Sequence, residues 1–248
     1  MTLEAHDVAL VRAANPGPFT LTGTNTWFVG RDPCWIVDPG PALDDHVAAV
    51  AAEAEARGGA GGIVLTHSHE DHAGAVGAVA ERTGARLHEA APGAAAGPFV
   101  AVATPGHTPD HLAFVAGEVA FTGDAVLGEG SVFVVGQLGE YLDALRALRA
   151  RDLALLCPGH GPVVEDPAAK LDEYVAHRLD RERRLLEALA AGARTVDAML
   201  DAAWDDAPKE LRLAAAATLG AHLEKLEDEG RLPEGVERPR LPQGLRAP

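Results

Sequence analysis

The sequence is short of cysteine, of aromatic residues and of positive charge. Two cysteines, Cys34 and Cys157, stand in apolar runs, which predicts two buried, reduced thiols rather than a disulfide. Aromatic residues make up 4% of the 248 residues and hydrophobic residues 47%, so we expect a core of small aliphatic side chains. Lys and Arg number 21 against 37 Asp and Glu, giving a net charge of −16. Such an acidic surface repels phosphate backbones and anionic membranes at long range.

Long hydrophobic runs are also missing. No stretch approaches the length needed to span a bilayer, and the first twenty residues lack a basic start followed by an apolar segment. The sequence therefore predicts a cytoplasmic protein with no membrane partner. Its oligomeric state is left open.

Short strands and helices alternate along the first two thirds of the chain without one regular period. Strands are expected at 7–11, 24–29, 34–37, 63–65, 86–89, 100–103, 112–115, 119–121 and 153–157, and helices at 43–57, 75–83 and 138–150. Two strand-rich halves, each followed by a helix, favour an α+β fold of two facing sheets with helices outside over one wound parallel sheet.

The last third is predicted to be helical. A long helix at 166–190 is followed by shorter ones at 195–204 and 208–229, with Leu213, Leu219, Leu223 and Leu226 expected along one face. The pattern resembles a small winged-helix-type module. The predicted organisation is a catalytic core at 1–165, a connecting helix at 166–192, the module at 193–232 and a flexible tail at 233–248.

The strongest chemical signal is the cluster H-x-H-x-D-H that follows an apolar strand. His67 and His69 are two residues apart, so in extended backbone both imidazoles point to the same side and can reach one cation. Asp71 and His72 follow at once and can serve a second cation, as in two-metal sites with ions roughly 3.5–4 Å apart. Imidazoles packed this densely repel one another when protonated, which favours a metal site over unrelated surface histidines.

Three further polar residues, each in its own motif, follow short apolar runs. They are His107 in TPGHT, Asp124 after FTG, and His160 in CPGHG. Loops at strand ends gather into sites, and the neighbouring glycines let backbone pass close to a metal. We therefore expect these side chains to converge on the H-x-H-x-D-H cluster.

These motifs, in this order, resemble those of the metallo-β-lactamase-fold hydrolases. The resemblance covers about residues 7–165 and implies an αββα sandwich that binds two zinc ions, with iron or manganese also possible. It implies that His67, His69 and His107 bind one ion and that Asp71, His72 and His160 bind the other. Asp124 would bridge them.

A closer resemblance, to the β-lactamase-like endoribonuclease and glyoxalase II-like subgroup, extends over the rest of the chain. It is carried by GTNT at 23–26, LGEG at 127–130, YVAHR at 174–178 and the helical module. Asn25, in the GTNT motif, is a candidate substrate-binding residue. His177, Arg178 and Arg181 lie on the long helix just after the His160 loop, within reach of an anionic substrate group, and are further candidates; a solvated helix face with ordinary salt bridges is the alternative. The module's last helix is acidic, which is unlike a winged helix that reads nucleic acid and favours packing or dimer contacts.

The expected chemistry is attack by a metal-bridging hydroxide on a carbonyl or phosphorus. Asp71 and Asp124 would orient the hydroxide and carry its proton. His111, four residues after His107, is either a support for a ligand or a proton donor to the leaving group; a surface or capping histidine is the alternative.

Hydrolysis of a small ester, thioester or lactone is the predicted function. The alternative is metal-dependent cleavage of single-stranded RNA, which would need a basic groove containing Arg178, Arg181, Arg183 and Arg184. A mononuclear iron oxygenase or a DNA-binding regulator ranks lower, because all seven ligands are present and the helical tail is acidic.

Overall fold

The computed structural model describes residues 2–242, which form two compact units. The first unit contains the described residues up to Ala103 together with Asp110–Ser131 and Arg151–Ala168. The second contains Thr104–Pro109, Val132–Ala150 and the described residues from Ala169 onward. Each unit is described separately below.

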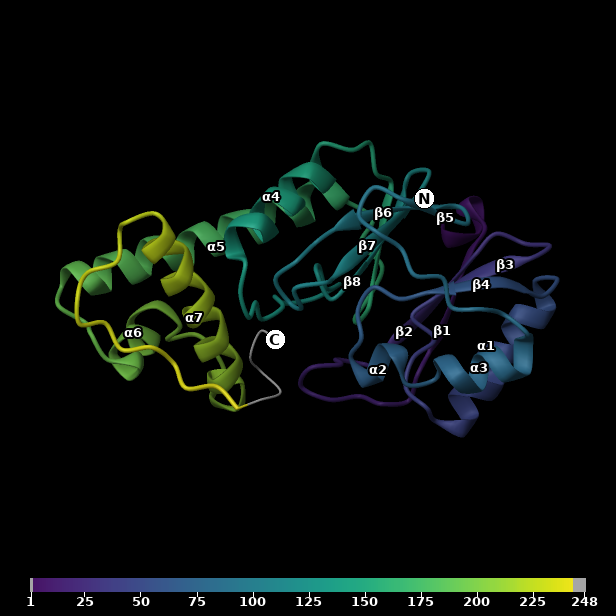
Figure 1. The fold of residues 1–248 in the computed structure, drawn as a ribbon, viewed down its shortest axis with the longest axis horizontal. Coiled ribbons are helices and arrows are strands. Elements are labelled where there is room, and N and C mark those ends of the chain that lie inside the picture. Colours follow the sequence, from purple (N-terminus) through teal and green to yellow (C-terminus); the bar gives the residue numbers. More distant parts are fainter. Residues whose placement is uncertain (1, 243–248) are drawn as a thin grey trace. The chain divides into compact units, whose positions relative to one another are not determined.

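The first unit contains two mixed β-sheets (Figure 1). One sheet has the order β1 (Val8–Arg12), β2 (Asn25–Val29), β3 (Cys34–Val37), β4 (Ala60–Val64). The other has the order β5 (Ala95–Ala96), β6 (Phe99–Ala103), β7 (Leu112–Ala116), β8 (Val119–Gly123), β9 (Leu155–Pro158). In each sheet neighbouring strands are antiparallel except the last pair, β3–β4 and β8–β9, which is parallel. The carboxyl ends of these parallel strands carry the motif loops.

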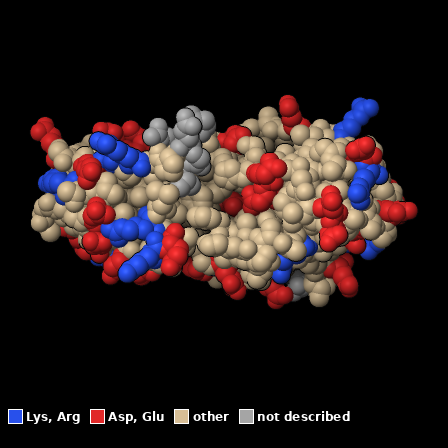
Figure 2. Space-filling view, turned by 90° about the horizontal axis from the view of Figure 1, so that it is seen from below, with Lys and Arg blue, Asp and Glu red and all other residues tan. Residues whose placement is uncertain are grey.

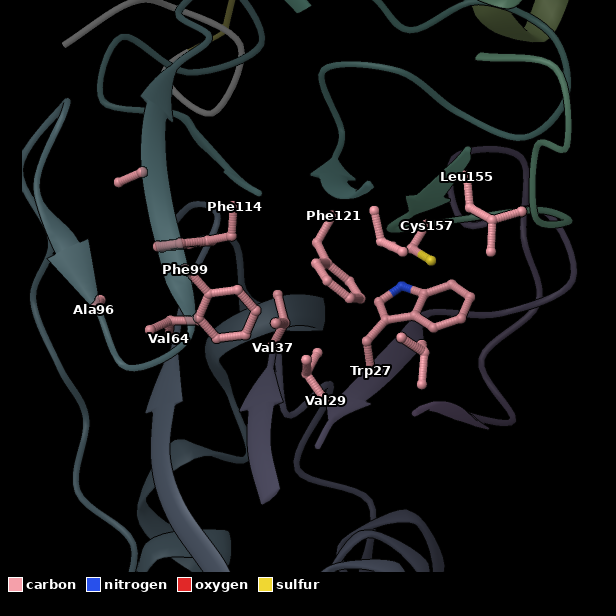
Figure 3. Close-up of a cluster of buried hydrophobic side chains, with 13 residues drawn as sticks. Trp27, Val29, Val37, Val64, Ala96, Phe99, Phe114, Phe121, Leu155 and Cys157 are labelled. Carbon is pink, nitrogen blue, oxygen red and sulfur yellow. The ribbon is translucent and has the colours of Figure 1, made fainter. Parts of the chain in front are cut away.

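A hydrophobic core fills the space between the two sheets (Figure 3). Trp27 of β2 meets Phe121 of β8 edge to face, with ring centroids 6.2 Å apart. Phe99 packs in the same way against Phe114 and Phe121, at 5.6 and 5.7 Å. Edge-to-face aromatic pairs add stabilisation beyond the burial of their area, so the few aromatic residues are concentrated where the sheets meet.

Helices cover the outer face of the first sheet. α1 (Asp44–Ala56) and α3 (Val76–Thr83) contribute Val47, Val50 and Val79 to a second core that also contains Phe28 and Ile36 of the sheet. The one-turn helix α2 (Glu70–Ala73) begins inside the H-x-H-x-D-H cluster, and the 3-10 helix η1 (Leu3–His6) precedes β1.

The two cysteines confirm the predicted reduced thiols. Cys34 and Cys157 are both free and buried. Cys34 lies in the core between the first sheet and its helices, and Cys157 lies in the core between the two sheets. Burial raises the pKa of both thiols. They therefore behave as small apolar side chains rather than as metal ligands.

The second unit is helical. It contains α4 (Leu138–Arg149), most of α5 (Pro167–Ala190), α6 (Val196–Ala203), the 3-10 helix η2 (Lys209–Leu211) and α7 (Arg212–Asp228). Leu185 and Leu189 of α5, Leu200 of α6 and Leu223 of α7 share one buried core. Thr195 caps α6 by accepting the N–H of Ala198, as expected at a helix start.

Three expectations about local structure were wrong. Residues 86–89 form one isolated bridge, Ile63 to Leu87, instead of a strand. Leu213 is 47% exposed, because six residues turn a helix by about 600° and so place it off the face of Leu219. The tail up to residue 242 is not loose, since Val236 and Leu241 pack on the helical core; residues 243–248 lie outside the described part.

The two mixed sheets with flanking helices confirm the predicted α+β class. Within residues 2–242, the structure contains no helix whose length and hydropathy suit a bilayer crossing. The second unit also takes in 104–109 and 132–150, segments that the sequence had placed in the catalytic core.

Candidate metal centre

Two groups of metal-binding side chains meet in the first unit. The donor atoms of His67, His72 and Asp124 lie within 4.8 Å of one another, and so do those of Asp71, His72 and His160. These residues come from the segment after β4, the turn after β8 and the loop after β9. Strand ends that are far apart in sequence therefore bring together the imidazoles and carboxylates that the motifs predicted.

Asp38 fixes the tautomers of two histidines and so determines which ring nitrogen of each faces the cluster. Its Oδ2 accepts a hydrogen bond from His72 Nδ1 at 2.9 Å and another from the Thr66 hydroxyl at 2.7 Å. Thr66 Oγ1 in turn lies 3.0 Å from Nδ1 of His67 and accepts its proton, because its own proton is given to Asp38. Both imidazoles then present Nε2 lone pairs, the arrangement seen around metal-binding histidines.

The backbone of Asp38 is held as firmly as its side chain. Asp38 is 1% exposed and has φ of 52°, and its Oδ1 accepts the N–H of Thr66 at 2.8 Å. Two residues later, Gly40 donates to His72 O of α2 at 2.9 Å and accepts from the N–H of Ala75, the residue before α3, at 2.8 Å. The sequence interpretation missed Asp38. Its place after β3, before Pro39 and Gly40, is the same signal that marked the other loops.

His160 and His69 complete the donors of the first unit. His160 Nδ1 lies 3.4 Å from the carbonyl oxygen of Gly23, to which it donates, so its Nε2 faces the carboxylates. That Nε2 lies 3.2 Å from Asp71 Oδ2 and 3.4 Å from Asp124 Oδ1. His69 directs Nδ1 toward Nε2 of His67, at 3.1 Å. Two ring nitrogens facing each other at this distance suit a shared proton or a shared cation.

The electrostatics of the cluster favour positive charge. Burial would raise the pKa of Asp124, but His72 and His160 outweigh it and hold that pKa well below its usual range. Burial would lower the pKa of His160, but Asp124 and Asp71 outweigh it and raise the pKa to about 9. The pKa of His72 is raised for the same reason, by Asp124 and Asp38. Nitrogen and carboxylate donors in this environment fit a divalent cation such as zinc.

The loop that carries His160 is anchored by β2. Asn25 Nδ2 donates to the carbonyl oxygens of Pro158 at 3.0 Å and Gly161 at 2.9 Å, and Trp27 Nε1 donates to Pro158 at 3.0 Å. Asn25 is fully buried and its Oδ1 accepts from Arg12 Nε. These contacts give Asn25 a positioning role; the predicted contact with substrate stays a prediction.

Gly159 approaches the cluster so closely that a side chain has no room. A Cβ there would lie 2.6 Å from Asp124 Oδ1 and 2.6 Å from Cε1 of His72. We expect Gly159→Ala to displace both candidate ligands and lower metal occupancy to below one ion per chain, measured by elemental analysis after gel filtration. Gly139→Ala, at a position on α4 where a Cβ meets nothing within 4 Å, is the control and should keep the wild-type metal content. Full occupancy in Gly159→Ala would contradict the assignment of this loop.

His111 supports Asp124. Its Nε2 accepts the backbone N–H of Asp124 at 3.1 Å, its ring stacks on that of His67 with centroids 5.0 Å apart, and it is 1% exposed. The surface alternative is therefore excluded. The contact with Asp124 favours the supporting role, and proton donation to a leaving group stays a prediction.

His107 lies in the second unit, on the Thr104–Pro109 loop between β6 and β7. Its Nδ1 lies 3.4 Å from the carbonyl oxygen of Phe133 and its ring is 4.8 Å from the Phe133 ring. Donation from Nδ1 leaves Nε2 for a cation, as in the other histidines. Its predicted place beside His67 and His69 stays a proposal.

The helical candidates for substrate binding are engaged inside the second unit. Arg178 is 2% exposed and donates to the carbonyl oxygen of Val132, and Arg181 donates to Ala203 O and to Asp206. Burial and the two arginines lower the pKa of His177 to about 4. These contacts give the arginines a structural role within the unit; substrate binding by the three residues stays a prediction.

Two parts of the chain match known protein families. Residues 19–98 and 87–160 match the metallo-beta-lactamase superfamily, and residues 195–235 match the beta-lactamase associated winged helix domain, which confirms the predicted C-terminal module. The chain is 32% identical over 251 residues to a beta-lactamase-like protein 2 homolog of Caenorhabditis elegans, covering 90% of this chain and 85% of that protein.

Two further relatives bear on activity and fold. An atrochrysone carboxyl ACP thioesterase of Aspergillus chevalieri is 35% identical over 217 residues, covering 73% of this chain and 65% of that protein. A metallo-beta-lactamase family protein of Thermus thermophilus has the same fold, with a TM-score of 0.72, 23% identity and coverage of 90% of this chain and 94% of that one. The chain belongs to the metallo-beta-lactamase superfamily and is a metal-dependent hydrolase.

Proposed function

We propose that the chain hydrolyses a small ester, thioester or lactone with two metal ions, of which zinc fits the donor set best. The observation that carries the proposal is the pair of donor groups sharing His72, in which Nδ1 of His67, His72 and His160 each donates a hydrogen bond and Nε2 is directed into the cluster. His67, His69 and His107 would hold one ion, and Asp71, His72 and His160 the other. Asp124 would bridge them.

The residues around the two ions would then have different roles in the reaction. Two bound ions would activate a water molecule and polarise the substrate carbonyl. Asp71 is 29% exposed at its side chain, the most open carboxylate of the cluster, and would accept the proton from that water. Asp124, at 9%, is more enclosed and would hold the orientation of the cluster. Thr24 Oγ1 lies 3.4 Å from Asp71 Oδ2 and donates to it, which fixes the carboxylate.

A thioester is the favoured substrate class. The named activity of the Aspergillus chevalieri relative is that of a thioesterase, and its alignment covers 73% of this chain. The surface of the chain is acidic, and acidic side chains are spread over the face shown in Figure 2 with basic ones between them. A neutral or locally anionic acyl substrate meets less repulsion from such a surface than a polynucleotide does.

The arginines that RNA binding would require have other partners. Arg183 pairs with Asp180 and Glu187, and Arg184 pairs with Asp205. Arg178 and Arg181 are buried in the helical unit. RNA cleavage is therefore kept as an outcome of the experiment below.

The test is a parallel assay on an acyl thioester, a lactone and single-stranded RNA, each with and without a chelator. We expect metal-dependent hydrolysis of the thioester to be the fastest reaction. His69→Ala should reduce it to the uncatalysed rate, because one ion loses a ligand. The adjacent Glu70→Gln is the matched control, since Glu70 is exposed, and should stay active. Chelator-sensitive cleavage of RNA with no hydrolysis of either acyl compound would overturn the proposal in favour of a ribonuclease.

A further inference from the structure

The segment 132–135 links the His107 loop to the C-terminal helices inside the second unit. On one side, Val135 N donates to Gly106 O at 2.7 Å, and Phe133 O accepts from Nδ1 of His107. On the other side, Val132 O accepts from Arg178 of α5, and Val134 N donates to Oγ1 of Thr218 of α7 at 3.1 Å. The segment therefore has hydrogen bonds to the histidine loop and to both helices.

The contact with Thr218 needs a hydroxyl group. Thr218 Oγ1 donates its proton to Ala214 O at 3.3 Å within α7, and so it accepts from Val134 N. Thr218 is 3% exposed and Val134 is fully buried. A buried N–H that loses its acceptor is costly, so the position of Val134 depends on this one oxygen atom.

Arg178 holds Val132, two residues before Val134. Its guanidinium lies over the ring of Tyr141, 5.7 Å from the ring centroid, and donates to Val132 O. The same Tyr141 side chain borders the His107 loop, since a Cβ at Gly106 would lie 3.0 Å from it. Gly106 has φ of 136°, which suits glycine. The loop is thus shaped by α4 as well as by the segment.

The consequence for His107 is a fixed ring. A metal-binding histidine depends on the acceptor of its other ring nitrogen for its tautomer and orientation, and loss of that acceptor typically lowers metal affinity by about 10–100-fold. Here the acceptor, Phe133 O, stands between two residues that the C-terminal helices hold.

We propose that the C-terminal helical module positions the metal ligand His107, with Thr218 and Arg178 as positioning residues that act through Val132, Phe133 and Val134. The inference deepens the proposed function, because it takes His107 as a ligand of the first ion. It gives the winged-helix-type module a part in building the metal centre rather than in binding nucleic acid.

The test measures metal affinity one ion at a time, by competition with a chromophoric chelator. In an Asp71→Ala background the remaining ion would be the one bound by His67, His69 and His107. In a His69→Ala background the remaining ion would be the one bound by Asp71, His72 and His160. We expect Thr218→Val to weaken zinc binding about tenfold in the first background and to leave it unchanged in the second.

Two variants separate positioning from a general loss of stability. Thr218→Ser keeps the hydroxyl and should restore wild-type affinity, whereas a packing defect would persist. Arg183→Gln, on an exposed part of α5, should have no effect in either background. Arg178→Lys loses the planar guanidinium and is the second test variant if Thr218→Val fails to fold; it should weaken the same ion.

Equal affinities in Thr218→Val and wild type, or equal weakening in both backgrounds, would overturn the inference. The result is independent of any substrate. A wild-type protein that binds two ions but hydrolyses none of the acyl compounds would end the proposed function and leave the positioning inference standing.

Discussion

Asp38→Asn should weaken the binding of both metal ions by about 10–100-fold each and reduce thioester hydrolysis at least as much. Oδ2 of Asp38 accepts hydrogen bonds from His72 directly and from His67 through Thr66. In the Asn variant an NH2 group at the Oδ2 position cannot accept either proton. Turning the amide over would place its oxygen where it can accept from His72 and the Thr66 hydroxyl. Its NH2 group would then face the backbone N–H of Thr66, and that hydrogen bond would be lost. One atom thus controls a ligand from each of the two proposed sites.

The measurement is a zinc titration of Asp38→Asn against a competing chelator, with hydrolysis assayed in excess zinc. Asp32→Asn is a matched control, because Asp32 also has a left-handed backbone conformation, with φ of 56°, but is exposed. It should bind both ions as tightly as wild type. Unchanged affinity in Asp38→Asn would show that the hydrogen bonds of Asp38 do not set the tautomers of the ligands.

The sequence predicted the fold class and the clustering of most candidate ligands, because both follow from local patterns. Apolar runs predicted β3 (Cys34–Val37) in full and β7 (Leu112–Ala116) to within one residue. The convergence of Asp71, His72, Asp124 and His160 followed from placing motif residues at strand ends. Parallel pairing of β3 with β4 and of β8 with β9 brings such ends together.

The supporting residues could not be predicted from the same patterns. Asn25 was expected to contact substrate, yet its amide holds the His160 loop across 133 residues of sequence. Arg178 looks like an ordinary solvated arginine in a helical sequence, and its burial depends on Val132 and Tyr141 from distant segments. A hydrogen-bond acceptor that comes from a distant segment produces no periodic pattern in the sequence, so it cannot be predicted from one.

Removing the metal ions is expected to abolish thioester hydrolysis and to give the folded protein a new dependence of stability on pH. Without cations, the carboxylates keep His160 protonated up to a pKa of about 9, against 6.5 for an ordinary histidine, and they raise the pKa of His72 as well. A raised pKa contributes stability that is fully present below pH 6.5 and is lost as the pH rises through about 9. The Tm of the metal-free protein should therefore fall by several degrees across this interval.

The experiment compares Tm at pH 6.5, 7.75 and 9 for chelated and zinc-loaded protein, pH values that span the interval between the ordinary and the raised pKa of His160. In the loaded protein a cation takes the place of the protons, so its Tm should be nearly flat and higher throughout. His177 and the fully buried His222, whose pKa values burial and neighbouring cations lower to about 4 and about 3, contribute stability that is lost as the pH falls below 6.5. This loss is the same in the chelated and the zinc-loaded protein, so the difference between the two Tm curves reports the cluster. Metal-free Asp124→Asn should show a smaller fall, because it lacks the carboxylate that raises both histidine pKa values. A metal-free Tm that is constant or rises toward pH 9 would mean that protons do not replace the cations in this cluster.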